Sequence, residues 1–304
     1  MKSPTKAHFA LLGTNLFFAI NYSAVKYFTA NHYAGPFALN IIRIGASLIL
    51  FWILFLFSKE KTKIYKKDIP AFLLCGLTGI GLNQMFFIKG LSFTFPIHAS
   101  LLTLITPVMI TIIAAVILRE RITIAKVTGL LLSISGAVLL LATKEASAPG
   151  DNILLGDTLV ILSALAYTFY FILVKPLMEK YSPVHVMRLV FTFGFFMILP
   201  VCTKEFSNIT WQYFTLKDWG FLFLITIPGT FLAYTFNVYG IKILSASTAG
   251  AYIYSQPVFA VIIAMIFLKE QLTLDKAIAA LLIFAGVFLS NRKANGLFKD
   301  RINE

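Results

Sequence analysis

The chain has 304 residues, of which 59% are hydrophobic and 13% are charged. A soluble globular domain carries about a quarter charged residues, so this composition excludes an ordinary soluble protein and predicts an integral membrane protein. The formal net charge of +13 does not indicate nucleic-acid binding, because no loop is long enough to form a reader domain, and contact with anionic lipid headgroups accounts for the excess of Lys and Arg.

Ten apolar runs follow one another along the chain. A membrane-spanning helix needs about 20 mostly apolar residues, and clusters of charged residues, Pro and Gly separate runs of that kind. The expected spans lie near residues 7–28, 36–57, 69–89, 96–118, 123–142, 153–174, 184–203, 219–240, 246–268 and 273–290. We therefore predict an all-α integral membrane protein with ten transmembrane helices.

Residues 100–123 and 250–273 match each other without a gap, at an offset of 150 residues. The matched pairs include Pro107 with Pro257, Glu120 with Glu270 and Thr123 with Thr273, and the same offset extends outward to Gly79 with Gly229 and Gly90 with Gly240. This agreement predicts a duplicated five-helix unit, and we place the two units at residues 1–145 and 146–304. Because five is an odd number, the second unit must enter the membrane from the opposite side, which makes the units inverted repeats.

The distribution of Lys and Arg predicts the orientation of the chain. With the N-terminus inside, 17 of the 26 Lys and Arg residues fall in inner segments and seven in outer ones, as the positive-inside rule requires. Both termini and the loop at 58–68 are therefore expected in the cytoplasm, and the loops at 144–151 and 204–217 outside. We expect a multi-pass protein of a bacterial inner (plasma) membrane.

The first two expected spans contain unusual polar residues. Asn21, Tyr22 and Lys26 lie in the first span, and Tyr22 and Lys26 share a helix face because they are four residues apart. Ionisable side chains inside a span usually face a cavity or a partner, but Lys26 is also near enough to the outer end to reach the interface, and both interpretations stay open. Arg43 lies deeper, in the second span. We expect it either to bond backbone carbonyls and Asn side chains or to bind a substrate anion.

The third and eighth expected spans carry matching polar faces. Asn83 and Gln84 lie in the third span, and the offset of 150 residues places Gln84 over Tyr234 and Phe87 over Asn237. Positions three residues apart lie on one helix face. The two faces are therefore predicted to meet across the pseudo-twofold axis between the units.

Pro107 and Pro257 fall in the middle of the fourth and ninth expected spans, directly after Thr106 and Gln256. A proline inside a helix removes a backbone donor and frees a carbonyl one turn earlier. Helices broken at matching positions of two inverted halves indicate a binding site near the membrane midplane. A kink that only improves packing is the alternative interpretation.

The polar residues of the spans suggest a class of substrate. The interiors of the expected spans contain no Asp or Glu; Asp157 comes closest, and its position near the start of the sixth span indicates a helix-start role. Tyrosines supply apolar walls with a polar tip, amides bind amino and carboxyl groups alike, and a fixed cation balances a carboxylate. We predict a neutral, zwitterionic or anionic metabolite. The candidate substrate-binding residues are Asn21, Tyr22, Lys26, Arg43, Asn83, Gln84, Thr106, Tyr170, Tyr234, Asn237, Tyr252 and Gln256.

No arrangement of residues indicates catalysis. The sequence shows neither metal-ligand spacing among its four His residues nor a nucleotide-binding glycine loop. We find no nucleophile or acid/base pair inside a span. We therefore expect no catalytic residue, no bound metal and no cofactor, which disfavours a membrane-embedded enzyme.

Taken together, these features resemble the EamA-type branch of the drug/metabolite transporter (DMT) superfamily over nearly the whole chain. The duplicated unit, the polar residues Asn21, Lys26 and Arg43, and the segments Pro107 to Glu120 and Pro257 to Glu270 carry the resemblance. It implies a ten-helix inverted-repeat fold with a central cavity lined by spans one, three, four, six, eight and nine. It also implies export or exchange of small metabolites, amino acids among them, by alternating access. An alignment of the sixth expected span with the first needs gaps. No role is therefore transferred from Lys26 to Lys175.

Two other functions of the same fold stay open, a channel-like facilitator and a multidrug exporter. The expected partners are a small-molecule substrate and membrane lipid, without nucleic acid. A monomer is compatible with the sequence, which leaves the oligomeric state, the substrate, the coupling ion and the direction of transport undetermined.

Overall fold

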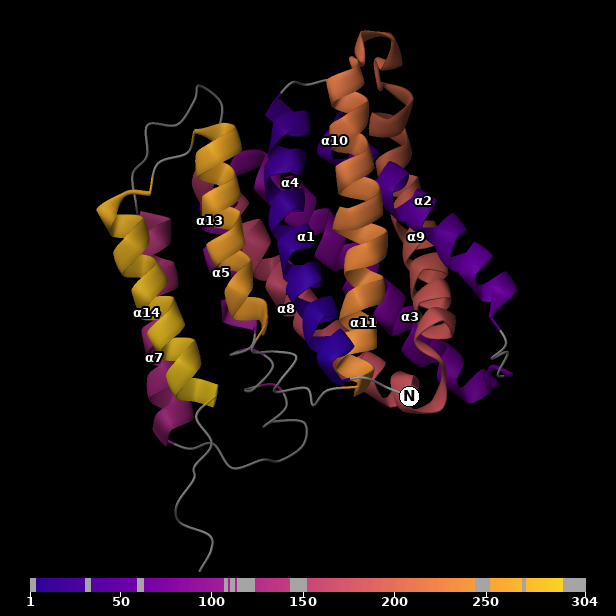
Figure 1. Cartoon of the computed structure of the whole chain (residues 1–304), viewed down its shortest axis with the longest axis horizontal. Helices are drawn as coiled ribbons and strands as arrows, with labels where there is room; N and C mark the ends of the chain where they lie inside the picture. Colours follow the sequence, from indigo (N-terminus) through magenta and orange to yellow (C-terminus); the bar gives the residue numbers. More distant parts are fainter. Residues whose placement is uncertain are drawn as a thin grey trace, which may run out of the picture.

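The chain forms a bundle of helices in the computed structural model shown in Figure 1. The structure describes residues 4–30, 34–58, 63–106, 109, 113, 124–142, 152–243, 252–269 and 272–291. The α-helices are α1 (Pro4–Ala30), α2 (Pro36–Phe57), α3 (Ile69–Gly76), α4 (Asn83–Phe93), α5 (Pro96–Leu102), α7 (Ile124–Ala142), α8 (Ile153–Lys180), α9 (Pro183–Ser207), α10 (Leu216–Thr226), α11 (Ala233–Ile243), α13 (Ser255–Leu268) and α14 (Leu274–Asn291). This described part contains no strand, which confirms the all-helical class.

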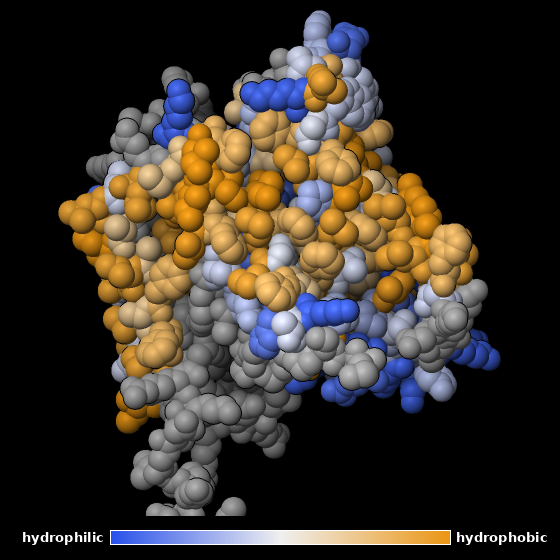
Figure 2. All heavy atoms as spheres, in the orientation of Figure 1, coloured by the Kyte–Doolittle hydropathy of each residue, from blue (hydrophilic) through white to orange (hydrophobic). Residues whose placement is uncertain are grey.

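Within the described residues, five helical segments are long and apolar enough to cross a membrane. They are Pro36–Phe57, Lys66–Phe93, Ile153–Lys180, Pro183–Ser207 and Leu216–Gly240. Figure 2 shows apolar side chains across the middle of one face of the molecule and hydrophilic ones above and below them. The structure thus supports a membrane protein, whereas the full number of ten spans stays a prediction. Much of the fourth expected span, with Pro107 and Glu120, lies outside the described residues.

Helices of the two units pack against each other in matching pairs. α1 packs against α11 and α13, and α8 packs against α4 and α5. These contacts are equivalent, because α1 and α8 are the first helices of their units, and their partners come from the third and fourth spans of the other unit. α2 packs against α9, and α7 against α14. The packing therefore has the arrangement of a duplicated unit, while the boundary at residue 145 stays a prediction.

Two π-helical turns interrupt the third and eighth spans at equivalent positions. η2 (Leu77–Leu82) joins α3 to α4, and η4 (Ile227–Leu232) joins α10 to α11, again at the offset of 150 residues. Thr230 shows the wider winding, since its Oγ1 donates to the carbonyl oxygen of Ile225, five residues earlier, at 2.9 Å. π turns often occur at functional sites. Here they precede the segments of α4 and α11 that face the centre of the bundle.

The fourth and ninth spans are also broken at equivalent positions. α5 ends at Leu102 and is followed by a turn at Thr103, while η5 (Tyr252–Tyr254), a 3₁₀ turn, precedes α13. Pro257 therefore lies in the first turn of α13 and not in the middle of a helix, which corrects the prediction of a mid-helix kink. A proline is tolerated in a first turn because its missing N–H would have no helical partner there.

Candidate substrate cavity

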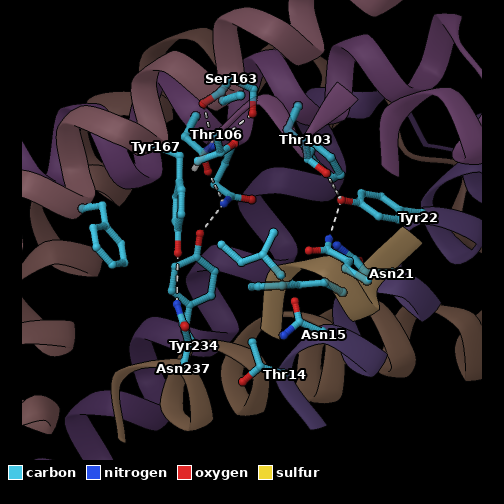
Figure 3. A pocket seen from close by; sticks show the side chains of 18 of the residues that line it. Thr14, Asn15, Asn21, Tyr22, Thr103, Thr106, Ser163, Tyr167, Tyr234 and Asn237 are labelled. Atoms are coloured by element: carbon cyan, nitrogen blue, oxygen red, sulfur yellow. Dashed lines mark hydrogen bonds between the residues drawn. The ribbon is translucent and has the colours of Figure 1, made fainter. Parts of the chain in front are cut away.

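A cavity lies at the centre of the bundle, between the two units (Figure 3). Each of the six spans implied by the resemblance contributes to its wall, and α2 adds Arg43. The lining residues are Thr14, Asn15, Phe18, Asn21, Tyr22, Arg43, Asn83, Gln84, Phe87, Thr103, Thr106, Ser163, Ala164, Tyr167, Phe171, Tyr234, Asn237, Ile253 and Gln256.

Nine of the twelve candidate residues line this cavity. They are Asn21, Tyr22, Arg43, Asn83, Gln84, Thr106, Tyr234, Asn237 and Gln256. The sequence therefore identified residues that the fold brings together from five helices and the segment that follows α5. Their role in substrate binding stays a prediction.

The other three candidates lie away from the cavity wall. Lys26 Nζ donates to the backbone oxygen of Ser92 at 3.2 Å and lies over the ring of Phe95. The hydroxyl of Tyr170 is buried and points at Met187 Sδ, 3.8 Å away. The hydroxyl of Tyr252 lies 2.6 Å from His8 Nδ1. Each has a partner within the protein, so the structure does not support placing them in the site.

Arg43 is the centre of the first polar network of the cavity. The residue is 1% exposed, and its Nη2 donates to Gln84 Oε1. The amide of Gln84 in turn donates to the hydroxyl of Tyr234 and to Asn83 Oδ1. Asn83 Nδ2 continues the network to α8, where it donates to Ser163 Oγ at 2.9 Å. Gln84 and Tyr234 are equivalent positions of the two units, so their contact confirms that the matching faces meet.

The guanidinium of Arg43 keeps unused binding capacity. Its Nε and Nη1 atoms are buried and have no hydrogen-bond partner in the described part of the chain. Among the described residues that line the cavity, none is Asp or Glu. A buried charge without a counterion is costly, and a ligand carboxylate can accept two parallel hydrogen bonds from a guanidinium. The cavity is therefore suited to an anionic group beside Arg43.

A second polar network lies on the opposite wall, around Tyr22. The amide of Gln256 donates to the hydroxyl of Tyr22, and Thr103 Oγ1 lies 3.3 Å from the same hydroxyl. The ring of Tyr22 packs against Phe87, with 5.2 Å between the ring centroids. Nearby, the buried Oδ1 of Asn21 has no partner in the described residues. This wall offers neutral donors and acceptors beside an aromatic surface.

Several lining residues had not been selected from the sequence. Ser163, Ala164, Tyr167 and Phe171 form one face of α8, and Asn237 Nδ2 donates to the hydroxyl of Tyr167 at 3.0 Å. The spacing of these four residues is typical of one helix face. The candidate Tyr170 follows Tyr167 by three residues, but its hydroxyl points at Met187 and not into the cavity. On α1, the face of Asn21 also includes Thr14, Asn15 and Phe18. The sequence indicates this face, because Phe18 lies three residues before Asn21, and Thr14 and Asn15 lie four and three residues before Phe18.

Comparisons with known proteins agree with this architecture. A model of the EamA-like transporter family matches residues 5–142 and again residues 154–292. "Uncharacterized transporter YetK" of Bacillus subtilis (strain 168) is 27% identical over 246 residues, which cover 81% of this chain and 74% of that protein. "Probable terminal-alkyne amino-acid exporter" of Streptantibioticus cattleyicolor is 28% identical over 232 residues, 76% of this chain and 75% of that protein. One crystal structure is similar with a TM-score of 0.64 at 19% identity, over 94% of this chain and 96% of that one, which supports the fold alone.

Proposed function

The chain belongs to the EamA-like transporter family, and from this premise we propose that it is a secondary transporter of small metabolites such as amino acids, which exports or exchanges them by alternating access. The observation that carries the proposal is the buried guanidinium of Arg43, which faces the cavity with two unused donor atoms and no carboxylate among the lining residues. A neutral, zwitterionic or anionic compound fits this charge. The similar exporter of S. cattleyicolor is named for an amino acid, which supports the same class.

Two carboxylates at equivalent positions support alternating access. Asp68 precedes α3 and accepts hydrogen bonds from Lys180 Nζ at 2.9 Å and from the Tyr181 hydroxyl at 2.8 Å. Asp218, 150 residues later, accepts from the Tyr27 hydroxyl at 3.0 Å. Each bond joins one unit to the other, and α3 and α10 begin at opposite ends of the bundle (Figure 1). Rocking of one repeat against the other would break these bonds in turn.

A multidrug exporter of lipophilic cations is the alternative with the same fold. An exporter that binds a proton and a lipophilic cation in turn needs a carboxylate in its cavity wall, and the described lining residues include none. A channel-like facilitator differs from a coupled carrier in that it cannot accumulate its substrate.

The purified protein in proteoliposomes, supplied with a labelled mixture of the common amino acids, tests the proposal. Uptake above that of protein-free vesicles is expected; no uptake of any amino acid would contradict this substrate class, and uptake that never exceeds equilibration would favour the facilitator.

Replacing Tyr22 with Phe is expected to lower this uptake several-fold. The change removes the hydroxyl that accepts from Gln256 and lies beside Thr103, and a typical hydrogen bond contributes about 0.5–1.5 kcal/mol. Replacing Tyr252 with Phe is the matched control, because Tyr252 belongs to the ninth span but contacts His8 outside the cavity. The measurement is the initial rate of amino-acid uptake for both variants. An equal loss of uptake in the two would argue against the cavity as the binding site.

The orientation of the chain can be tested by labelling. Thr210 and Lys67 are exposed, in the loops expected outside and inside, and the native Cys75 and Cys202 are buried. In intact cells, a membrane-impermeant maleimide is expected to label a Thr210→Cys variant. A Lys67→Cys variant is expected to react only after permeabilisation. The reverse result would show that the termini lie outside.

A further inference from the structure

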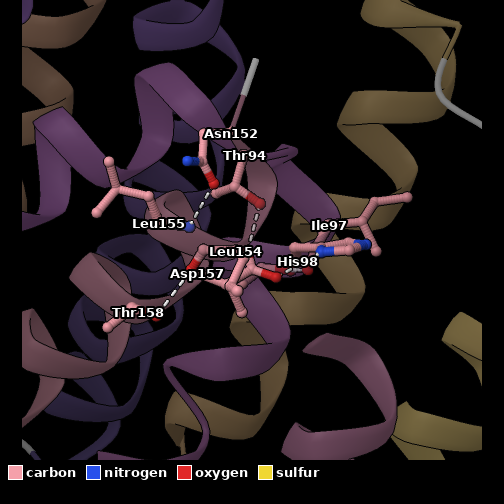
Figure 4. Close-up of polar contacts among 9 residues, drawn as sticks. Thr94, Ile97, His98, Asn152, Leu154, Leu155, Asp157 and Thr158 are labelled. Carbon is pink, nitrogen blue, oxygen red and sulfur yellow. Dashed lines mark hydrogen bonds and ion pairs between the residues drawn. The ribbon is translucent and has the colours of Figure 1, made fainter. Parts of the chain in front are cut away.

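Asp157 does not have the helix-start role that its sequence position suggested. The side chain of Asn152 caps α8 instead, by accepting from the backbone N–H of Leu155 at 3.0 Å. Asp157 lies inside the bundle, where it meets Thr94 at the end of α4 and His98 on α5 (Figure 4). All three residues are 0% exposed. A carboxylate is therefore buried in the interior, although it does not line the cavity.

The three side chains form a compact hydrogen-bonded cluster. Thr94 Oγ1 donates to Asp157 Oδ1, and His98 Nδ1 lies 3.0 Å from Asp157 Oδ2. The ring of His98 also packs against Phe95, with 5.7 Å between centroids. Burying ionisable groups is costly unless they are paired, and ionisable residues within a membrane protein's interior usually serve a function. Thr94 already satisfies one oxygen of the carboxylate, and His98 is the partner that can share or exchange a proton.

The helices that meet at this cluster also border the cavity. Gln84 lies on α4, Thr103 directly follows α5, and Ser163 lies two turns after Asp157 on α8. α5 has only seven residues, so a shift of His98 relative to Asp157 would be transmitted over a short distance to Thr103. A change of charge at the pair is thus able to alter the wall of the cavity without direct contact with the substrate.

The helices that pack around the pair carry other charged groups. Lys26 of α1 lies over the Phe95 ring, and Lys89 of α4 lies over the rings of Phe37 and Phe93. α13 carries no ionisable side chain. α7 and α14, which also contact α5, carry Lys126 in one case and Asp275 with Lys276 in the other, near their first turns. On α8 itself, the next charged residue after Asp157 is Lys175.

We propose that the His98–Asp157 pair binds and releases a proton during the transport cycle, so that substrate movement is coupled to a proton gradient. With the proton bound, the pair is an imidazolium beside a carboxylate and has no net charge. Release of that proton to water leaves a neutral imidazole and a net negative charge in the interior, which favours a conformation that exposes the pair to solvent. One proton is taken up on one side of the membrane and released on the other. The inference rests on the proposed transport function.

The proton site itself can be tested without any substrate. The full chain, labelled with ¹⁵N-histidine and held in lipid nanodiscs, is titrated from about pH 5 to about pH 9, and the His98 resonances are identified by their loss in His98→Gln. We expect His98 to titrate in this range, and its midpoint to move by about one pH unit or more in Asp157→Asn. Glu179→Gln is the matched control, because Glu179 is an exposed carboxylate on the same helix, and it should leave the midpoint unchanged. If Asp157→Asn fails to fold, Thr94→Val, which keeps both ionisable groups, must displace the midpoint instead. Absence of titration, or a midpoint that neither variant moves, would overturn the proposal.

Coupling is tested with the same variants in proteoliposomes. A pH gradient of one unit supports accumulation of up to about tenfold at one proton per substrate molecule. The gradient is expected to change the accumulation of the labelled amino-acid mixture by the wild type and by Glu179→Gln, but not by Asp157→Asn. If accumulation by the wild type does not depend on the pH gradient, transport is not coupled to protons. If no amino acid enters at all, the proposed substrate class fails, and the histidine titration still decides whether the pair is a proton site.

Discussion

Replacing Gln84 with Glu is expected to lower amino-acid uptake at least about tenfold, which corresponds to about 1.4 kcal/mol. Arg43 donates to Oε1 of Gln84, so the new carboxylate would pair with the guanidinium and cancel the positive charge of the cavity. A ligand carboxylate would then lose a charge-assisted hydrogen bond, worth about 1.5–3 kcal/mol. The hydroxyl of Tyr234 can donate to the glutamate as readily as it accepts from the amide, so the variant is expected to remain folded.

The matched control is Lys26→Met, which removes a cation of α1. Lys26 does not line the cavity and bonds Ser92 instead, so its loss should change uptake far less than Gln84→Glu. Initial rates are compared for protein of equal amount and equal thermal stability. Wild-type uptake in Gln84→Glu would show that Arg43 does not bind the substrate. Gln84→Ala is less informative, because it leaves both Arg43 and Tyr234 without the hydrogen bonds that they make to Gln84. A loss of uptake in that variant could then come from misfolding or from weaker substrate binding.

The variant Gly156→Ala is expected to destabilise the protein by about 1–3 kcal/mol or more, the usual cost of overpacking. A methyl group at Gly156 would lie 2.8 Å from the backbone oxygen of Gly90 and 2.8 Å from the backbone N of Thr94. Backbone atoms cannot rotate away, so α4 and α8 would have to separate. Small residues allow such close approach of helices in membranes. The thermal unfolding midpoint of the protein in detergent measures the loss.

Gly220→Ala provides the control for this prediction. Gly220 lies within α10, and a methyl group added there would have no described atom within 4 Å apart from its chain neighbours and the backbone of its own helix. Alanine is preferred to glycine inside a helix by about 1 kcal/mol, so this variant should be as stable as the wild type or slightly more stable. If Gly156→Ala and Gly220→Ala unfold at the same temperature, the close contact between α4 and α8 does not exist as described.

The sequence alone predicted the features that depend on composition and on the internal repeat. Apolar runs predicted the helical class, and the offset of 150 residues predicted that Gln84 and Tyr234 face each other, because inverted duplication places equivalent side chains on one axis. Nine of the 19 described lining residues followed from related reasoning, since polar side chains inside spans need an aqueous or polar surrounding. Arg43 was identified in this way, together with its two possible roles.

Features that depend on tertiary contacts were not predictable. The π turns η2 and η4 change the helical register, and glycines alone do not indicate that change. Tyr167 and Tyr170 are three residues apart on the same side of α8, so the sequence did not indicate which of the two hydroxyls faces the cavity. Asp157 looked like a helix-start residue because its partners, Thr94 and His98, come from other helices. Such a cluster becomes visible only when the fold brings the three segments together.

The sign of the charge that the cavity accepts is tested most directly by comparing an amino-acid mixture with labelled tetraethylammonium. Uptake of both is measured in proteoliposomes that contain the wild type, Gln84→Glu or Gln256→Ala. We expect the wild type to transport amino acids and not the quaternary ammonium ion, and both substitutions to reduce amino-acid uptake, because Arg43 and the amides bind a carboxylate-bearing or neutral compound. Robust electrogenic uptake of tetraethylammonium that neither substitution affects would contradict both the charge argument and the proposed site.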